Sequence, residues 1–205
     1  MDLPEREYGP SPAADELMTA MRELIRAATT TAAASEEMVR ITQGMRDLTA
    51  DLDRTRHARA RRIPFTPEDR ERIQAGAPWR MFPYTPQGIP QEIVVTDAVA
   101  RSRIQLTAAH EGPPGMLHGG FGAAIMDALL GVLVMAECRP AVTVELTTRF
   151  LRPTPLDCTV EAVGRVVEQG PRRIIAEGSI EHDGVPTVTA RGVFVPYAMP
   201  AQPAG

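Results

Sequence analysis

The stretch GGFGAAIMDALLGVLVMA occupies residues 119–136 and is rich in glycine, alanine, leucine and methionine. As a helix it would be apolar on nearly every face, so no side of it would favour water. A helix of this kind is expected where a curved antiparallel sheet wraps around it. Asp127 departs from the pattern, because it places an ionisable carboxyl group among apolar neighbours. An isolated buried charge is strongly disfavoured, so Asp127 is hydrated, paired with a neighbouring group or functional.

The segments around this helix have a hydrophobic period of two, which is typical of strands. Candidate strands cover residues 92–107, 142–151, 158–169, 173–182 and 185–195. Gln169-Gly170-Pro171 and Asp183-Gly184 supply the turns between the last three of them. The sequence therefore predicts an α+β fold in which one strand, the central helix and four further strands follow one another.

Residues 13–62 carry apolar residues at the three- and four-residue spacing of a helix. They are Leu17, Met21, Leu24 and Ala28, followed by Met38, Ile41, Met45, Leu48 and Leu52. The stripe is interrupted over residues 29–35, which indicates either one helix with a stammer or two helices that divide near Ser35. A narrow stripe on a charged helix does not fold alone. It must pack on the downstream domain, on a second copy or on another protein, and helical self-association is the favoured interpretation.

The chain is expected to have one folded domain with an extension in front of it. The predicted order is a disordered tail at 1–12, a helical, coiled-coil-like extension at 13–62, a short helix and Pro- and Gly-rich loop at 63–91, the sheet-and-helix domain at 92–197, and a disordered tail at 198–205. Thr66 and Pro67 are typical of the start of the short helix, and Gly76 of its end.

Composition excludes several classes of protein. The chain has 205 residues and a formal net charge of −4, from 22 basic and 26 acidic residues. This balance lacks the positive field that nucleic-acid binding requires, so no nucleic-acid partner is expected. All 22 basic residues are arginine, which excludes a Schiff-base lysine and a P-loop lysine and is typical of a GC-rich bacterial genome.

The cysteines and the N-terminal residues indicate the cellular compartment of the protein. Cys138 and Cys158 suit neither a disulfide framework nor a metal site, which suggests a reducing, cytoplasmic compartment. The first residues lack the features of a signal peptide. The apolar run at 123–136 is too short for a membrane span and contains Asp127.

The residues at the start of the central helix form, together with Asp127, a pattern that points to chemistry. Leu117-His118-Gly119-Gly120 precedes its first turn, where glycines let a substrate approach the backbone and free N–H groups can stabilise an oxyanion. With Asp127 in the later turns, the pattern indicates acyl transfer. Gly119 and Asp127 are eight residues apart, about 12 Å along a helix with a rise of roughly 1.5 Å per residue. One carbonyl group cannot reach both in a single chain, so the hypothesis predicts a site between two copies.

Two segments carry a resemblance to a known family. EGPPGMLHGG at residues 111–120, with an Asp nine positions after the His, and RFLRPTPL at residues 149–156 resemble the hotdog-fold acyl-CoA thioesterases of the phenylacetate-pathway (PaaI-like) branch. The resemblance covers residues 80 to 197, about half of the chain. It implies a five- or six-stranded antiparallel sheet around a long helix, two copies with joined sheets, and active sites at the dimer interface. Dimers of this family often pair into tetramers, and no metal or organic cofactor is implied.

The resemblance assigns catalytic roles by position. Asp127 matches the carboxylate that acts as a general base or nucleophile toward the thioester. Gly119 matches the residue whose backbone N–H polarises the thioester carbonyl. Thr143 matches the Ser or Thr that positions the attacking water.

Other matched positions concern substrate binding. His118 matches the motif histidine that positions the loop or contacts the thioester, and Gly120 follows it in the glycine pair. Many family members have an Asn six residues before the His, where this chain has Gly112 after Glu111, so Glu111 either takes a polar role or is a loop residue. Arg152 could bind the phosphates of coenzyme A, although an exposed strand-end arginine is the favoured interpretation.

Three functional readings remain open. The first is hydrolysis of an acyl-CoA or acyl-carrier thioester, with an acyl pocket drawn from Phe121, Met126, Leu130, Trp79 and Phe82. The second is hydration or dehydration of an enoyl thioester by the same fold, with His110 as the catalytic histidine. The third is a non-catalytic acyl-CoA-binding or assembly module in which the N-terminal helices carry the biological role.

Overall fold

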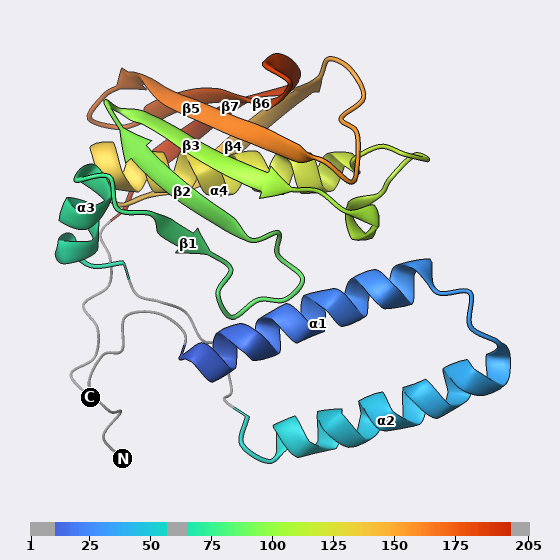
Figure 1. Cartoon of the computed structure of the whole chain (residues 1–205). Coiled ribbons are helices and arrows are strands. Elements are labelled where there is room, and N and C mark those ends of the chain that lie inside the picture. The colour runs from blue at the N-terminus through green and yellow to red at the C-terminus, as the bar shows by residue number, and fades with distance from the viewer. Residues whose placement is uncertain (1–10, 57–64, 198–205) are drawn as a thin grey trace.

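The computed structural model describes residues 11–56 and 65–197 (Figure 1). Its helices are α1 (Pro12–Thr30), α2 (Ser35–Asp53), α3 (Pro67–Gln74), the short 3-10 helix η1 (Ala108–His110) and α4 (Gly119–Glu137). Its strands are β1 (Trp79–Met81), β2 (Gln91–Thr96), β3 (Val99–Gln105), β4 (Ala141–Phe150), β5 (Thr159–Gln169), β6 (Ile174–His182) and β7 (Val185–Pro196). The predicted tails at 1–12 and 198–205 lie outside the described residues, apart from Ser11 and Pro12, which begin α1.

The strands form one seven-stranded antiparallel sheet in the order β1-β2-β3-β5-β6-β7-β4. β4, β5, β6 and β7 confirm four predicted strands, and Asp183-Gly184 makes the predicted turn with φ angles of 52° and 74°. The single strand predicted over 92–107 is wrong. It divides into β2 and β3 at Asp97-Ala98, where both residues have positive φ. The predicted loop also contains β1, so the sheet has more strands than the resemblance implies.

Helix α4 lies in the concave face of this sheet, as the sequence predicts (Figure 1). A row of small residues in register crosses the sheet beneath it, namely Ala100, Gly164, Gly178 and Ala190. An added Cβ at Gly164 would lie 2.7 Å from Leu130, and one at Gly178 would lie 2.7 Å from Met126. The small row therefore lets the helix approach the strands closely, and the sheet curves around it.

The C-terminal end of α4 is capped by α3. Arg70 donates from Nε and Nη2 to the Met135 carbonyl at 2.9 and 2.6 Å, and Gln74 donates to the Ala136 carbonyl at 2.9 Å. A cation at this end also complements the helix dipole. Thr66 and Asp69 form a capping box at the start of α3, which confirms the predicted start of this helix.

The extension consists of two helices, so the alternative with a division near Ser35 is the correct one. Neither α1 nor α2 has a buried residue. Figure 1 shows α1 along the domain, on the side of α4 away from most of the sheet, and α2 beyond α1. Arg22 ties α1 to the domain by donating to the Phe82 and Thr85 carbonyls at 2.8 and 3.3 Å.

By length and composition, α4 is the one helix among the described residues that could cross a membrane. α4 has 19 residues, so it is longer than the apolar run at 123–136, which on its own is too short for a membrane span. Since 56% of its most apolar window is buried inside the fold, and core helices pass the same test, this is weak evidence for a span.

Candidate active site

The first turn of α4 leaves one backbone donor free. His118 is the N-cap, and its Nδ1 accepts the Gly120 N–H at 3.0 Å. Its carbonyl accepts the N–H groups of Phe121 at 2.9 Å and Gly122 at 3.2 Å. In the described part of the chain, the Gly119 N–H has no partner. It is therefore available to a carbonyl oxygen, as the sequence predicts for an oxyanion donor.

This donor lies beside a pocket of about 430 Å³. The pocket is lined by Pro113, Met116, Leu117, Gly119, Phe150, Leu151, Arg152, Pro153, Thr154 and Val188. Most of these side chains are apolar, which suits an acyl chain or the thioester end of a ligand. An added Cβ at Gly119 would lie 3.0 Å from the ring of Phe150, so glycine keeps the backbone accessible there.

The lining differs from the one proposed from the sequence. None of Phe121, Met126, Leu130, Trp79 and Phe82 lines this pocket, and Met126 and Leu130 are fully buried in the core. Sequence reasoning missed Phe150, although the residue lies in the RFLRPTPL segment. The sequence gives only a weak signal for a pocket role of Phe150, because an aromatic residue at the end of a strand is more often part of a core.

The loop before α4 is held by Glu111. The Glu111 carboxylate accepts the Gly115 N–H at 2.6 Å, and residues 111 and 117 form a backbone bridge. Glu111 therefore orders the turn that carries Pro113 and Met116 into the pocket wall. An added Cβ at Gly112 would lie 2.8 Å from the Cα of His118. Glycine at position 112 therefore permits the close approach of the two backbone segments.

Asp127 and Thr143 lie apart from this pocket. Asp127 is exposed two turns along α4, and its carboxylate has no hydrogen-bond or ion-pair partner among the described residues. Thr143 is exposed on β4. A single chain thus does not bring Asp127 and Gly119 together, which agrees with the separation of about 12 Å expected along a helix.

Arg152 and the strand before it border the site. Arg152 lines the pocket and donates from Nη1 to the Pro186 carbonyl at 2.7 Å. β4 is an edge of the sheet and exposes Val142, Val144 and Phe150. A long apolar edge strand of this kind is a template for pairing with another chain.

His110, the histidine of the hydratase reading, is engaged in packing. Its Nδ1 accepts the Thr107 N–H at 3.0 Å, and its ring packs edge-on against Phe121 with centroids 5.3 Å apart. Burial lowers the pKa of His110 below its ordinary value. In the part of the chain that the structure describes, no carboxylate pairs with His110, so the His-acid pair of that reaction is not formed there.

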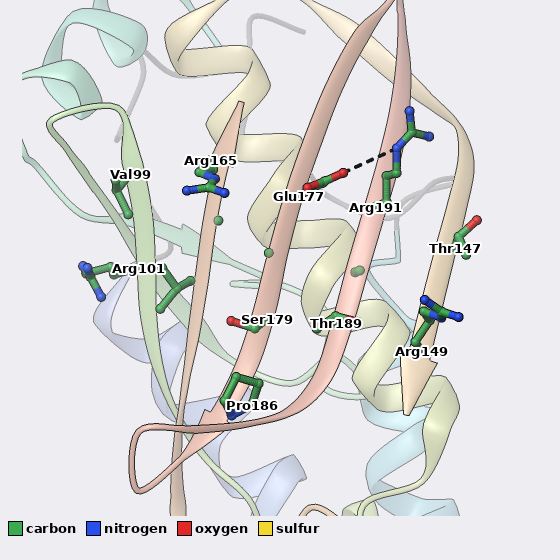
Figure 2. Close-up of a pocket in the computed structure, with 14 residues that line it drawn as sticks. Val99, Arg101, Thr147, Arg149, Arg165, Glu177, Ser179, Pro186, Thr189 and Arg191 are labelled. Carbon is green, nitrogen blue, oxygen red and sulfur yellow. Dashed lines mark ion pairs between the residues drawn. The ribbon is translucent and has the colours of Figure 1, made fainter. Parts of the chain in front are cut away.

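A larger hollow of about 950 Å³ lies on the outer face of the sheet. Figure 2 shows its labelled side chains in front of the strands and α4 behind them. Arg165, Glu177 and Arg191 are in register there, and the Arg191 Nε lies 3.5 Å from Glu177. None of the residues that the sequence assigns to the site lines this hollow, so the candidate active site is the pocket at the start of α4.

Comparison with known proteins shows which family the chain resembles. Residues 114–189 match a family model described as the thioesterase superfamily. This part of the chain is similar to the thioesterase superfamily. A solved thioesterase superfamily protein aligns with 91% of the chain and 97% of its own length, at 26% identity and a TM-score of 0.77. The alignment with this superfamily protein extends into the N-terminal helices, since residues 65–197 make up only about two thirds of the chain.

Two further relatives match shorter parts of the chain. An acyl-coenzyme A thioesterase of Xenopus laevis, THEM4, is 34% identical over 74 residues, which are 36% of this chain and 33% of that protein. The chain therefore spans about a third of the length of this curated relative. A conserved protein of Pseudomonas aeruginosa is 25% identical, with 50% of this chain and 85% of that one covered and a TM-score of 0.47. The hotdog fold and the thioesterase resemblance are confirmed, and the PaaI-like branch stays a prediction.

Proposed function

We propose that this protein hydrolyses an acyl-CoA thioester at a site shared by two copies of the chain. The observation that carries the proposal is the unpartnered Gly119 N–H at a mostly apolar pocket. The superfamily match and the acyl-coenzyme A thioesterase among the relatives support this class of reaction. An acyl-carrier thioester would offer the same reacting group.

The proposed dimer joins two sheets along β4. Antiparallel pairing of two β4 edges about a two-fold axis normal to the sheet makes one continuous sheet. Both copies of α4 then lie on the same face and run in opposite directions. The start of one α4 thus faces the later turns of the other. Asp127 of the second copy and Gly119 of the first therefore form one site. Pairing of such dimers into a tetramer would preserve these sites.

The reaction follows from these groups. The Gly119 N–H donates to the thioester oxygen and stabilises the negative charge that develops on it. Asp127 either takes a proton from water, which Thr143 orients, or attacks the carbonyl itself and is released by water. A C–O bond forms, the C–S bond breaks, and the thiolate leaves as coenzyme A and is protonated. Arg152, which lines the pocket, binds a phosphate of the coenzyme A portion.

Turnover of short, long and aromatic acyl-CoAs tests the proposal through thiol release. Asp127→Asn should lower turnover by about 10² or more, the scale of a lost acid–base group. A binding module would show no turnover in either form, and that result would overturn the proposal.

Two substitutions at Gly119 test the oxyanion donor. Gly119→Pro removes the N–H at the first helical position, where proline is well accommodated, and should lower turnover by roughly 10²–10³. Gly119→Ala is the matched control, because it keeps the N–H and adds the same contact with Phe150. Equal losses in both variants would assign the effect to crowding and would contradict the donor role.

A further inference from the structure

Phe150 is an exposed aromatic residue that lies against the first turn of α4. Figure 2 shows Arg149 on the outer face of the sheet, so the next residue of β4 points to the helix side. The ring of Phe150 lies 3.0 Å from the position of an added Cβ at Gly119 and 3.6 Å from one at Gly122. These two glycines are three residues apart, on one face of α4. The ring therefore faces bare helix backbone.

The backbone of Phe150 is fixed, whereas its ring is not part of the core. Phe150 pairs with Val188 in the register of β4 and β7. Phe150 is 57% exposed, while Leu117 and Val188, the other side chains near Gly122, are buried. Among these three side chains, Phe150 is thus the one that can be substituted without loss of core packing.

The ring lies where the acyl group of a bound thioester begins. Gly119 and Phe150 line the same pocket. An oxygen atom that accepts the Gly119 N–H lies about 2.9 Å from the nitrogen, and the carbonyl carbon is one bond of about 1.2 Å further. The two groups bonded to that carbon are the sulfur, which is the same in every substrate, and the acyl chain. Selection at this place therefore acts on the first carbons of the acyl chain.

We propose that Phe150 is a specificity-determining residue that selects acyl groups without a branch next to the thioester carbonyl. A linear chain passes the ring as a single row of methylene groups, whereas a branch at the first carbon places a second carbon against the ring. The neighbouring wall does not yield, because Leu117 and Val188 belong to the core. This inference rests on the hydrolysis of the proposed function and names its substrate class. The contacts that carry it lie within one chain, so it does not require the β4 dimer.

Two isomeric substrates, hexanoyl-CoA and 2-ethylbutanoyl-CoA, test the selection, because they contain the same atoms and differ only in branching. The measured quantity is the ratio of their kcat/KM values, obtained from thiol release. Both substrates are assayed with one preparation, so the ratio does not depend on the fraction of enzyme that is folded. In the wild type the linear substrate should be favoured by at least about tenfold, the scale of one methylene group in an apolar pocket. Equal kcat/KM values for the two isomers would overturn the inference.

Substitution of Phe150 separates the pocket from the lower intrinsic reactivity of a branched thioester, which is the same for every variant. Phe150→Ala removes the ring and should shift the ratio toward the branched substrate by at least about tenfold. Phe150→Leu keeps an apolar side chain of intermediate size and should shift it less. Tyr197→Ala is the matched control, because it truncates an exposed aromatic side chain outside the pocket, and it should change the ratio by less than about twofold. Equal ratios for Phe150→Ala and Tyr197→Ala would contradict the selection.

Dissociation constants separate this inference from the hydrolysis. Ketone analogues of the two thioesters, in which a methylene group replaces the sulfur, keep the carbonyl and cannot be hydrolysed. Isothermal titration calorimetry with these analogues should show the same preference, and Phe150→Ala should reduce it. A Phe150-dependent preference without turnover of any thioester overturns only the proposed hydrolysis. Turnover with a preference that Phe150→Ala leaves unchanged overturns only this inference, and the absence of both binding and turnover overturns both.

Discussion

His118 determines which amide of α4 a ligand can use. Its ring nitrogen and its carbonyl accept the N–H groups of residues 120, 121 and 122, and the Gly119 N–H is left free. Because Nδ1 is an acceptor, the neutral ring carries its proton on Nε2. His118 is thus the N-cap of α4, and its hydrogen bonds leave the Gly119 N–H free to donate to an oxyanion.

Gly112 should tolerate no side chain. In Gly112→Ala the new Cβ would lie 2.8 Å from the backbone of His118, so the loop before α4 must move. We expect the free energy of unfolding to fall by about 1–3 kcal/mol and turnover to fall with it. Urea denaturation with parallel assays measures both. Gly44→Ala, where an added Cβ has nothing within 4 Å, should leave both unharmed, and equal behaviour of the two variants would contradict the close approach.

His110 should make stability depend on pH. Burial lowers the pKa of His110 below its ordinary value of 6.5, so the unfolded chain takes up the proton first as pH falls. The free energy of unfolding should therefore fall as pH decreases through 6.5 and below. In His110→Asn, whose side-chain oxygen can accept the Thr107 N–H, denaturant titrations from pH 8 to 5 should show a shallower decline. An unchanged slope would assign the pH dependence to other groups.

At the scale of elements, periodicity predicted α4 and most of the sheet because burial on all faces and alternation leave strong patterns. It missed the turn at Asp97-Ala98, because this turn contains no glycine, the residue that usually marks a positive φ. It also missed β1, a strand of three residues in a proline-rich segment. Among the candidate site residues, Gly119 was predicted from its place before the helix, whereas the catalytic role of Asp127 stays a prediction. The contacts of Glu111 and Phe150 could not be predicted, because a motif does not show that the Glu111 carboxylate accepts the Gly115 N–H or that the Phe150 ring lies near Gly119.

In the row of small residues beneath α4, Gly178 should be sensitive to substitution. Its added Cβ would meet the Val163 carbonyl and the Gly164 Cα, which are backbone atoms that cannot turn away. Gly178→Ala should therefore cost about 3 kcal/mol of stability or prevent folding. Gly164→Ala is the matched comparison, because its nearest atoms are flexible ends of Leu130 and Leu129. A larger loss at Gly164 than at Gly178, measured by thermal and chemical denaturation, would contradict this account.

For the whole molecule, one chain leaves two features incomplete, namely an unpaired edge strand and an Asp127 distant from the Gly119 donor. In the proposed dimer, a second copy completes both. This arrangement could not be predicted in detail from periodicity, because patterns within one chain report its own burial and not the surfaces that another copy covers. The spacing of Gly119 and Asp127 along a helix was the exception, since it sets a distance that one chain cannot close.

Mixing of two inactive variants measures the shared site most directly. Asp127→Asn and Gly119→Pro are each purified as full chains, allowed to exchange subunits at equal concentrations, and assayed for thiol release. In a shared site, a mixed dimer holds one site with both an intact Gly119 and an intact Asp127. Half of the dimers are mixed, so the mixture should regain about a quarter of the wild-type activity. If the mixture stays as inactive as its components after exchange is verified, each site lies within a single chain and the account is contradicted.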